Sequence, residues 1–440
     1  VYTSHLKQYA FVRWTIQWLW RIGYPIYVKY VHASLLFISS KRSAIRWRPL
    51  ITLKQFAQKR GMPIYKLTNA AVVETPEPKV FPSCDQDYLI SPHNRFKFPE
   101  IYVTAMNNGM VYGGSSLILA EDKVVCHDLY NFERDYTSEE LHGRALIDPK
   151  SRRIRCLLHD EEPERIPAAA SFVDACASNY AHWLTEVLPR VAVFCADERF
   201  KGIPIVINSG LHQNIMESLF LITGSEREVI LLPVGRGLHC DKLYITSASG
   251  YVPFEWRKTK LSDCSHGVFS PPAFNMLRTH LHEQVENSEV QTWPKRIFLR
   301  RNSEYRKVVN AIEVENLFLS HGYVVIEPEK LTFLQQVVLF NNAKSIVRST
   351  GAALANIIFS PQGSKISILI SKHPDTIYWY WQNIACVTGK AVNYVFGKIS
   401  DSRVHGIHAS FFVDLNDLES LISELESELG DSSQNRHHSP

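Results

Sequence analysis

Apolar and polar positions follow a different pattern on either side of about residue 161. Beyond it, short apolar runs of strand length alternate with segments of helical spacing, in two successive series. The first series covers 161–285 and the second covers 286–430. Alternating strands and helices are typical of parallel sheets whose crossover connections are helices. We therefore predict an α/β chain with two doubly wound, Rossmann-like domains and a cleft between them.

The individual elements of these two series can be placed by run length and spacing. Strands are predicted at 168–175, 202–208, 241–247, 295–301, 323–328, 345–349 and 364–370. Helices are predicted at 213–223, 310–321, 331–343 and 351–359, and a last helix at 415–429 with Gly430 as its stop. Residues 431–440 are polar and are predicted to be disordered.

The segment 76–160 has a different pattern. Between Asn94 and Asp148 apolar and polar residues alternate, and Asn108-Gly109 and Gly113-Gly114 interrupt the alternation. Alternation broken by such glycine pairs is typical of β-hairpins. We predict a small β-rich unit here.

The N-terminal segment 1–75 is unusually basic. Residues 1–60 contain eleven Lys or Arg and no acid, a formal charge of +11, whereas the rest has 37 basic against 44 acidic residues. A predicted helix at 11–22 carries Arg13, Gln17 and Arg21 as one narrow polar stripe on an apolar, Trp-rich surface. Such a helix fits an anionic membrane surface, or it packs on the protein itself. A bilayer span needs about 18 apolar residues, and no stretch here reaches that.

Composition, cysteine usage and the absence of glycosylation acceptors indicate in which cellular compartment the protein is found. Apolar residues make up 45% and charged residues 21%, as in ordinary globular proteins. The eight cysteines are scattered without a CxxC pair, which indicates neither a zinc site nor a disulfide framework. The sequence also has no Asn-x-Ser/Thr glycosylation acceptor. We predict a cytoplasmic protein, peripheral on the cytoplasmic face of a membrane, with no nucleic-acid partner because no recognised nucleic-acid module is present.

The stretch "NYAHWLTEVLPR", residues 179–190, combines reactive side chains at helical spacing. His182 and Glu186 are four apart and share one helix face, with Asn179 one turn earlier. Either side chain can take a proton from a hydroxyl group within hydrogen-bond reach. A buried His–Glu pair that only ties the helix to a loop is the structural alternative.

Two further motifs suit a phosphate ligand. The segment "STGAALAN", 349–356, offers backbone N–H groups at a helix start, although its small residues also allow tight packing. Arg300 and Arg301 end a predicted strand, where doubly wound sheets bind ligands. Successive strand residues point to opposite faces, so only one of these two arginines is expected to reach the phosphates.

These motifs, with "VVIEPEKLTFLQQVVLFNNAKSIV", resemble glycosyltransferase family 61 in order and spacing, over about residues 165–400. The resemblance implies inverting chemistry and a two-Rossmann-domain, GT-B-like architecture. It implies that Asn179, His182 and Glu186 are catalytic and that Arg190 and Gln336 support the substrate. The donor diphosphate would be bound by Arg300, Arg301, Arg306, Ser349, Thr350, Gly351, Ala352 and Asn356.

The sequence departs from the family pattern at one position of the phosphate loop. The family usually has His before Gly351, and here that residue is Thr350; Ala353 also replaces a second Gly. The phosphate contacts of the missing His are then either lost or made by Ser349 and Thr350.

The resemblance implies transfer of a sugar from a nucleotide-sugar donor to a glycan or lipid-linked glycan acceptor, in surface or capsular polysaccharide biosynthesis. Arginines are expected to replace a metal, so no cofactor is predicted. Asp85 and Asp87 in "CDQD" are similar to the acid pair of metal-dependent transferases but lie outside the matched region. The alternative is a non-catalytic carbohydrate-binding or scaffold subunit, which Thr350 keeps open.

Overall fold

The computed structural model describes residues 47–89, 94–132, 145–148, 151–156, 160, 162–252, 267–286, 293–303, 306–373, 379–401, 404 and 409–434. These residues form two compact units. Unit 1 contains residues 74–94 together with the chain from 289, and unit 2 contains the rest of the described chain up to 288. The helix predicted at 11–22 lies outside the described residues.

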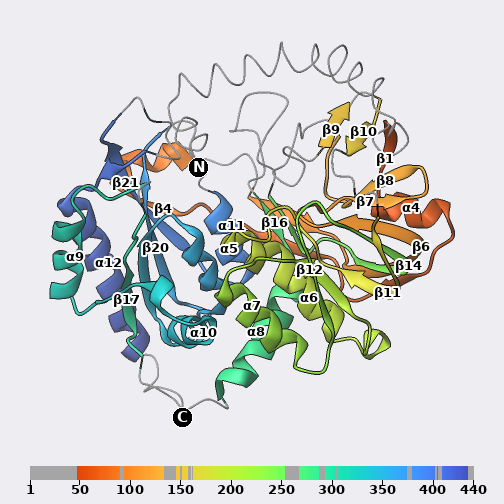
Figure 1. Cartoon of the computed structure of the whole chain (residues 1–440). Helices are drawn as coiled ribbons and strands as arrows, with labels where there is room; N and C mark the ends of the chain where they lie inside the picture. Colours follow the sequence, from red (N-terminus) through yellow and green to blue (C-terminus); the bar gives the residue numbers. More distant parts are fainter. Residues whose placement is uncertain are drawn as a thin grey trace. The chain divides into compact units, whose positions relative to one another are not determined.

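Unit 2 is built on one mixed sheet (Figure 1). Its strand order is β13-β12-β11-β14-β6-β7-β8-β1-β10-β9, with β2 also paired to β6. The first four strands in this order are parallel, and β6, β7 and β8 form an antiparallel meander. The strands are β1 (Arg48–Thr52), β2 (Ile64–Lys66), β6 (Tyr102–Tyr112), β7 (Ile118–Ala120), β8 (Lys123–Cys126), β9 (Ala145–Asp148), β10 (Arg153–Cys156), β11 (Glu164–Ser171), β12 (Ile205–Asn208), β13 (Val229–Leu232) and β14 (Gly237–Thr246).

Helices cover this sheet. Leu53 and Phe56 of α4 join a core of sheet residues that includes Tyr102, Met106 and Leu243. The C-terminal glycine of α7, Gly224, has φ 70 and ends that helix at the predicted position. The remaining elements are α4 (Leu53–Lys59), α5 (Tyr180–His182), η3 (Trp183–Val187), α6 (Leu188–Cys195), η4 (Glu198–Phe200), α7 (Gln213–Thr223) and α8 (Pro271–Glu286), with the short pairs β3 (Ala71–Glu74)–β5 (Arg95–Phe98) and β15 (Gly250–Tyr251)–β16 (Val268–Phe269).

The β-rich segment differs from its prediction in two ways. It is not a separate unit, because β6 pairs along its length with β14 and so extends the parallel strands. Asn108-Gly109 is not a turn but lies inside β6, where Asn108 takes the left-handed φ of 52. A Cβ on Gly109 would lie 2.6 Å from Leu243 Cδ2, so this glycine serves close packing between neighbouring strands.

Unit 1 contains a second sheet, with the order β18-β17-β19-β20-β21-β22 and β4 also paired to β21. Strands β17 to β21 are parallel to one another. The strands are β4 (Lys79–Phe81), β17 (Arg296–Leu299), β18 (Val324–Ile326), β19 (Ser345–Ser349), β20 (Lys365–Ser371), β21 (Val392–Ile399) and β22 (Phe411–Phe412).

Helices lie on both faces of the second sheet (Figure 1). Phe318 of α9 and Leu421 of α12 pack with Phe298 and Val347 of the sheet, and α10, η7 and α11 lie on the other face. The α12 helix passes Gly430 and ends at Gln434, so the predicted stop and the start of the predicted tail were wrong. The elements are η2 (Ser83–Leu89), α9 (Ala311–Ser320), η6 (Pro328–Lys330), α10 (Phe333–Asn342), η7 (Ala352–Phe359), α11 (Trp379–Val387) and α12 (Leu415–Gln434).

The mixed α/β fold is therefore confirmed, whereas the domain boundaries differ. The predicted boundary at 160/161 falls inside the sheet of unit 2, and residues 74–94, predicted to belong with the β-rich segment, supply β4 to unit 1. None of the helices that the structure describes has the length and apolarity needed to cross a membrane.

Candidate active site

The helix that carries His182 and Glu186 contains a widened turn. It begins at α5, where the Asn179 side chain accepts a hydrogen bond from the Ala181 N–H at 3.0 Å, and continues through η3 into α6. Within η3 the Leu188 N–H donates to the carbonyl of Trp183, five residues earlier. Pro189 follows and has no N–H to continue the regular ladder, which favours such a turn. Single π-turns of this kind are frequent at functional sites.

The predicted His–Glu pair is formed. His182 Nδ1 lies 2.5 Å from Glu186 Oε1. The His182 side chain is 7% exposed and the Glu186 side chain 15%. An ionised carboxylate only accepts hydrogen bonds, so Nδ1 carries the proton in this contact. The imidazole thus fixes one carboxylate oxygen of Glu186.

Glu186 lines a pocket of unit 2 that encloses about 650 Å³, its open mouth included. Ser171 and Asp174 come from the carboxyl end of β11, and Thr246 and Ser247 from that of β14. Strands β11 and β14 are neighbours at the point where the strand order reverses, and open α/β sheets bind ligands outside such a point. The pocket therefore lies at the expected position for a ligand of this sheet.

Arg190 holds the Glu186 turn against the wall of this pocket. Its Nε donates to the Glu186 carbonyl at 2.8 Å and its Nη2 to Asp174 Oδ2 at 3.1 Å. From the other side, Ser249 Oγ donates to the same carbonyl at 3.1 Å. Asp174 was not among the predicted residues; it lies three residues after the end of β11, although the predicted strand 168–175 contained it.

The two neighbouring arginines of unit 1 have different surroundings. Arg300 donates through Nε and Nη2 to both carboxylate oxygens of Glu315, at 2.9 and 2.5 Å, and through Nη1 to Glu327 at 3.2 Å. These ion pairs raise the pKa of Arg300. Arg301 points the other way and donates to the Thr350 carbonyl at 2.7 Å. The two side chains thus diverge, as predicted, and Arg301 lies at the loop, although β17 ends at Leu299 and both arginines follow it.

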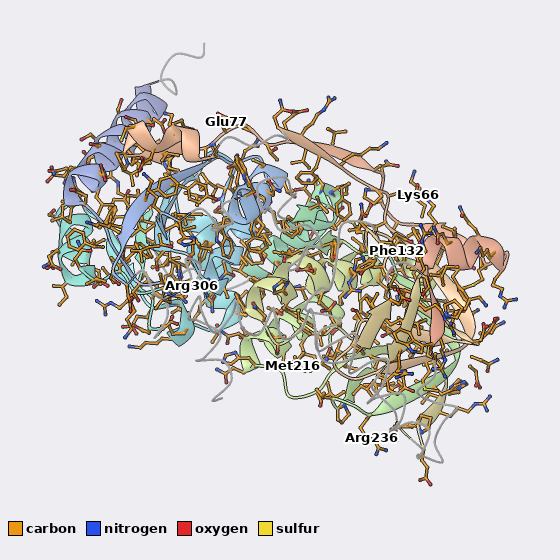
Figure 2. The ribbon with its side chains drawn as sticks, turned by 90° about the horizontal axis from the view of Figure 1, so that it is seen from above. Lys66, Glu77, Phe132, Met216, Arg236 and Arg306 are labelled. Atoms are coloured by element: carbon orange, nitrogen blue, oxygen red, sulfur yellow. The ribbon has the colours of Figure 1, made fainter. Side chains whose placement is uncertain are left out.

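Arg301 is one of three arginines near this loop, of which Arg348 is buried and Arg301 and Arg306 are half-buried. Burial, Arg306 and Arg348 all lower the pKa of Arg301. Burial also lowers the pKa of Arg306 and of Arg348. We call Arg301, Arg306 and Arg348 the arginine cluster; Figure 2 labels Arg306 among the side chains of unit 1.

The loop between β19 and η7 has the predicted form. Ser349 and Thr350 are buried, and Gly351 precedes η7, which begins at Ala352. A Cβ on Gly351 would lie 2.0 Å from Arg301 Nη1, so only glycine leaves room for that guanidinium. The loop therefore lies at the carboxyl end of β19, beside β17, where this sheet also reverses its order.

Asn356 and Gln336 contact each other rather than the loop surface. The Asn356 amide donates to Gln336 Oε1 at 2.7 Å, and both side chains are buried. This contact fixes η7 on α10. A direct donor contact, which the resemblance implies for Asn356, stays a prediction.

The acid pair of "CDQD" has no metal-site geometry in the part that is described. Asp85 accepts from Lys372 Nζ at 2.6 Å, and the side chain of Asp87 lies outside the described residues. Among the described residues, no three His, Cys, Asp or Glu side chains are grouped so that they could hold a metal ion.

Arg348, like Asp174, is a site residue that the sequence did not predict. It lies in "SIVRS", an apolar strand, and its side chain is only 5% exposed. An arginine inside such a strand, directly before the Gly351 loop, was the available signal.

Comparison with known proteins agrees with the motifs. The model of the family described as Glycosyltransferase 61 matches residues 180–367, from the first residue of α5 into β20. No curated protein matches the chain. The matched range contains His182, Glu186 and the arginine cluster. Residues 180–367 thus match the model of glycosyltransferase family 61, and this match points to a glycosyltransferase that uses a sugar donor and a glycan acceptor.

Proposed function

We propose that this protein is an inverting glycosyltransferase that moves a sugar from a nucleotide-sugar donor to a glycan acceptor. Surface or capsular polysaccharide is the proposed product. The observation that carries the proposal is the Glu186 carboxylate, which lines a pocket while His182 Nδ1 holds it at 2.5 Å. The family match over residues 180–367 supports the same reaction class.

In this mechanism Glu186 is the general base. Its carboxylate takes the proton of the acceptor hydroxyl while that oxygen attacks the anomeric carbon. The bond from the anomeric carbon to the phosphate oxygen breaks, and the nucleoside diphosphate leaves with the electron pair. Attack from the side opposite the leaving group inverts the configuration. His182 acts as a positioning residue, since it orients the carboxylate from within the protein.

The donor diphosphate is assigned to unit 1. Arg301 and Arg306 would neutralise the charge that develops on the leaving group, and the start of η7 would supply backbone N–H groups. Arginine can do this without a metal, so we propose a metal-independent reaction. The strand orders of the two sheets support a GT-B-like pair of Rossmann-like domains.

The acceptor is proposed to be a glycan held at a membrane by a lipid. The support is the charge of +11 within residues 1–60, which suits an anionic cytoplasmic surface. We propose a cytoplasmic location, peripheral on that surface.

The test is a panel of nucleotide sugars. A donor that binds the folded protein raises its thermal unfolding midpoint. Each hit is then incubated with candidate acceptors, in chelator, and the anomeric configuration of the product is read by NMR. Inverted product formed in chelator supports the proposal; activity that returns only with Mn²⁺ or Mg²⁺ contradicts metal independence. Glycan binding without transfer or donor hydrolysis would favour the non-catalytic alternative, which Thr350 motivates.

A further inference from the structure

We propose that Arg348 is a direct ligand of the donor diphosphate and supplies the positive charge that residue 350 lacks. This inference rests on the proposed donor site in unit 1. Its basis is a buried guanidinium beside the Gly351 loop.

Arg348 is buried with its polar atoms unsatisfied. Its side chain is 5% exposed, and Nε and Nη1 have no hydrogen-bond partner among the residues that the structure describes. A buried charge without partners is strongly unfavourable, so such a group usually has a ligand or an ion pair. Within the described chain, Arg348 has no ion-pair partner.

The guanidinium is directed at the Gly351 loop. Arg348 Nη2 lies 3.8 Å from the position of a Cβ on Gly351, and Arg301 Nη1 lies 2.0 Å from that position. Two guanidinium groups therefore flank one glycine. Arg306, which is half-buried, adds a third guanidinium, and its buried Nε also has no partner among the described residues. Its φ of 57 is rare for an arginine, and strained residues of this kind concentrate at functional sites.

The charges around the cluster show what it would bind. Arg306 and Arg348 repel the charge of Arg301, and Arg306 also repels that of Arg348. Glu329 attracts both Arg301 and Arg348. Glu329 is exposed and accepts a hydrogen bond from the Asn302 amide at 2.7 Å. Among the residues that the structure describes, three guanidinium groups against this one exposed carboxylate leave a positive excess. A ligand with at least two negative charges, such as a diphosphate, would balance it.

Position 350 explains why a third arginine is useful here. The family pattern has His at this position, and this chain has Thr350. Thr350 uses its carbonyl to accept from Arg301 and has no side-chain charge. Arg348 lies two residues earlier, in β19, which ends at Ser349 directly before Thr350.

The experiment measures binding of inorganic pyrophosphate to the full chain by calorimetry at low salt. Arg348→Met keeps the side-chain length and removes the charge. We expect it to weaken pyrophosphate binding at least tenfold and to leave the ligand-free unfolding midpoint unchanged or higher, because an unbalanced buried charge is gone. Arg296→Met, at the opposite end of β17, is the matched control and should bind pyrophosphate like the original chain.

Pyrophosphate affinity of Arg348→Met within twofold of the original would overturn the inference, as would absence of pyrophosphate binding by the original chain. If Arg348→Met does not fold, Arg348→Lys keeps the charge but loses the planar fork, and it should bind at least threefold more weakly. Sugar transfer is measured separately. If the original chain transfers sugar but Arg348→Met binds pyrophosphate normally, the proposed function stands and this inference fails. If Arg348→Met loses pyrophosphate binding but the original chain transfers no sugar, only this inference stands.

Discussion

His182 and Glu186 have different surroundings although they form one pair. The imidazole is buried and is not among the residues that line the pocket, whereas the carboxylate lines it. A group that must meet the acceptor hydroxyl has to be within hydrogen-bond reach of the pocket. This geometry supports Glu186 as the base and His182 as the group that holds it.

Glu186→Gln is therefore expected to lower kcat by about 10²-fold or more, since the amide cannot accept the proton. His182→Gln keeps a hydrogen-bond donor and should lower kcat less. Donor binding, measured by calorimetry, should change little in both variants. The control is Glu198→Gln, an exposed glutamate of η4 in the same unit. Near-normal turnover of the Glu186 variant would remove this residue from the chemistry.

Mutations of Arg300 and Arg301 are expected to affect different properties, stability for Arg300 and ligand binding for Arg301. Arg301→Met should weaken nucleoside diphosphate binding by about 1.5–3 kcal/mol, the range for a charge-assisted contact. Arg300→Met should chiefly cost stability, about 1 kcal/mol, because it breaks a half-exposed ion pair with Glu315. Calorimetry and thermal unfolding of both variants check this. A larger binding loss in Arg300→Met would reverse the assignment.

At the residue scale, the sequence predicted what local geometry determines. The contact of His182 with Glu186 follows from helix periodicity. Arg300 and Arg301 diverge as alternation along a strand predicts, although β17 already ends at Leu299. The ion pair of Arg300 with Glu315 does not follow from periodicity, because it needs the packing of α9 on the sheet. The burial of Arg348 was missed for the same reason: a single charged residue in an apolar strand gives no information about its neighbours.

Among the elements, the η3 turn depends on the short strand beside it. Gly250 of β15 lies against this turn, and a Cβ there would be 2.6 Å from the Thr185 carbonyl oxygen and 3.2 Å from Glu186 Cγ. The glycine thus fixes how closely the strand approaches the candidate base. Ser249, its neighbour, adds the hydrogen bond to the Glu186 carbonyl.

Gly250→Ala is predicted to displace the turn. We expect a loss of about 1–3 kcal/mol in stability from overpacking, and a lower kcat because Glu186 moves. Thermal unfolding and steady-state kinetics measure the two effects. Ser249→Ala is the control for this site, since it adds no bulk and removes only one hydrogen bond, worth about 1 kcal/mol. Unchanged kinetics in Gly250→Ala would show that the turn tolerates the shift.

Elements with strong periodicity were predicted closely, whereas two local signals, Asn108-Gly109 and Gly430, were misleading. The α7 and α10 helices lie within the predicted ranges, since their apolar spacing, Gly224 and the Thr332 capping box agree. Asn108-Gly109 failed as a turn because β14 offers β6 a long partner, which outweighs a local turn preference. Gly430 failed as a stop, and α12 continues through it.

At the scale of the molecule, the order of the predicted strands along the chain could not show which of them share a sheet. The meander of β6, β7 and β8 looked independent because its alternation resembles a separate antiparallel sheet. Its residues nevertheless build the pocket next to Glu186, since Leu117 and His127 line the same wall. The acceptor pocket that we propose thus depends on a segment outside the matched family range.

The basic segment gives a prediction for the whole protein. The intact protein should float with vesicles that contain anionic lipid. High salt should abolish most of this vesicle binding, and deletion of residues 1–30 should abolish it. Each Lys or Arg near an anionic surface contributes about 1 kcal/mol, and salt screens this attraction. Neutral vesicles are the control, and the deletion ends before β1. No flotation of the intact protein at low salt would contradict membrane binding.

The pairing of β4 with β21 has a consequence for how the protein is made. Lys79 is paired with Asn393, so a strand synthesised early waits for a partner that leaves the ribosome near the end of translation. Unit 1 therefore cannot complete its sheet until β21 has been synthesised and has left the ribosome. Until then β21 is absent, and the edge of β20 that it would cover stays open to wrong partners. Chains stopped before β21 should accordingly be captured by chaperones or aggregate, whereas synthesis past α12 should release them as folded protein.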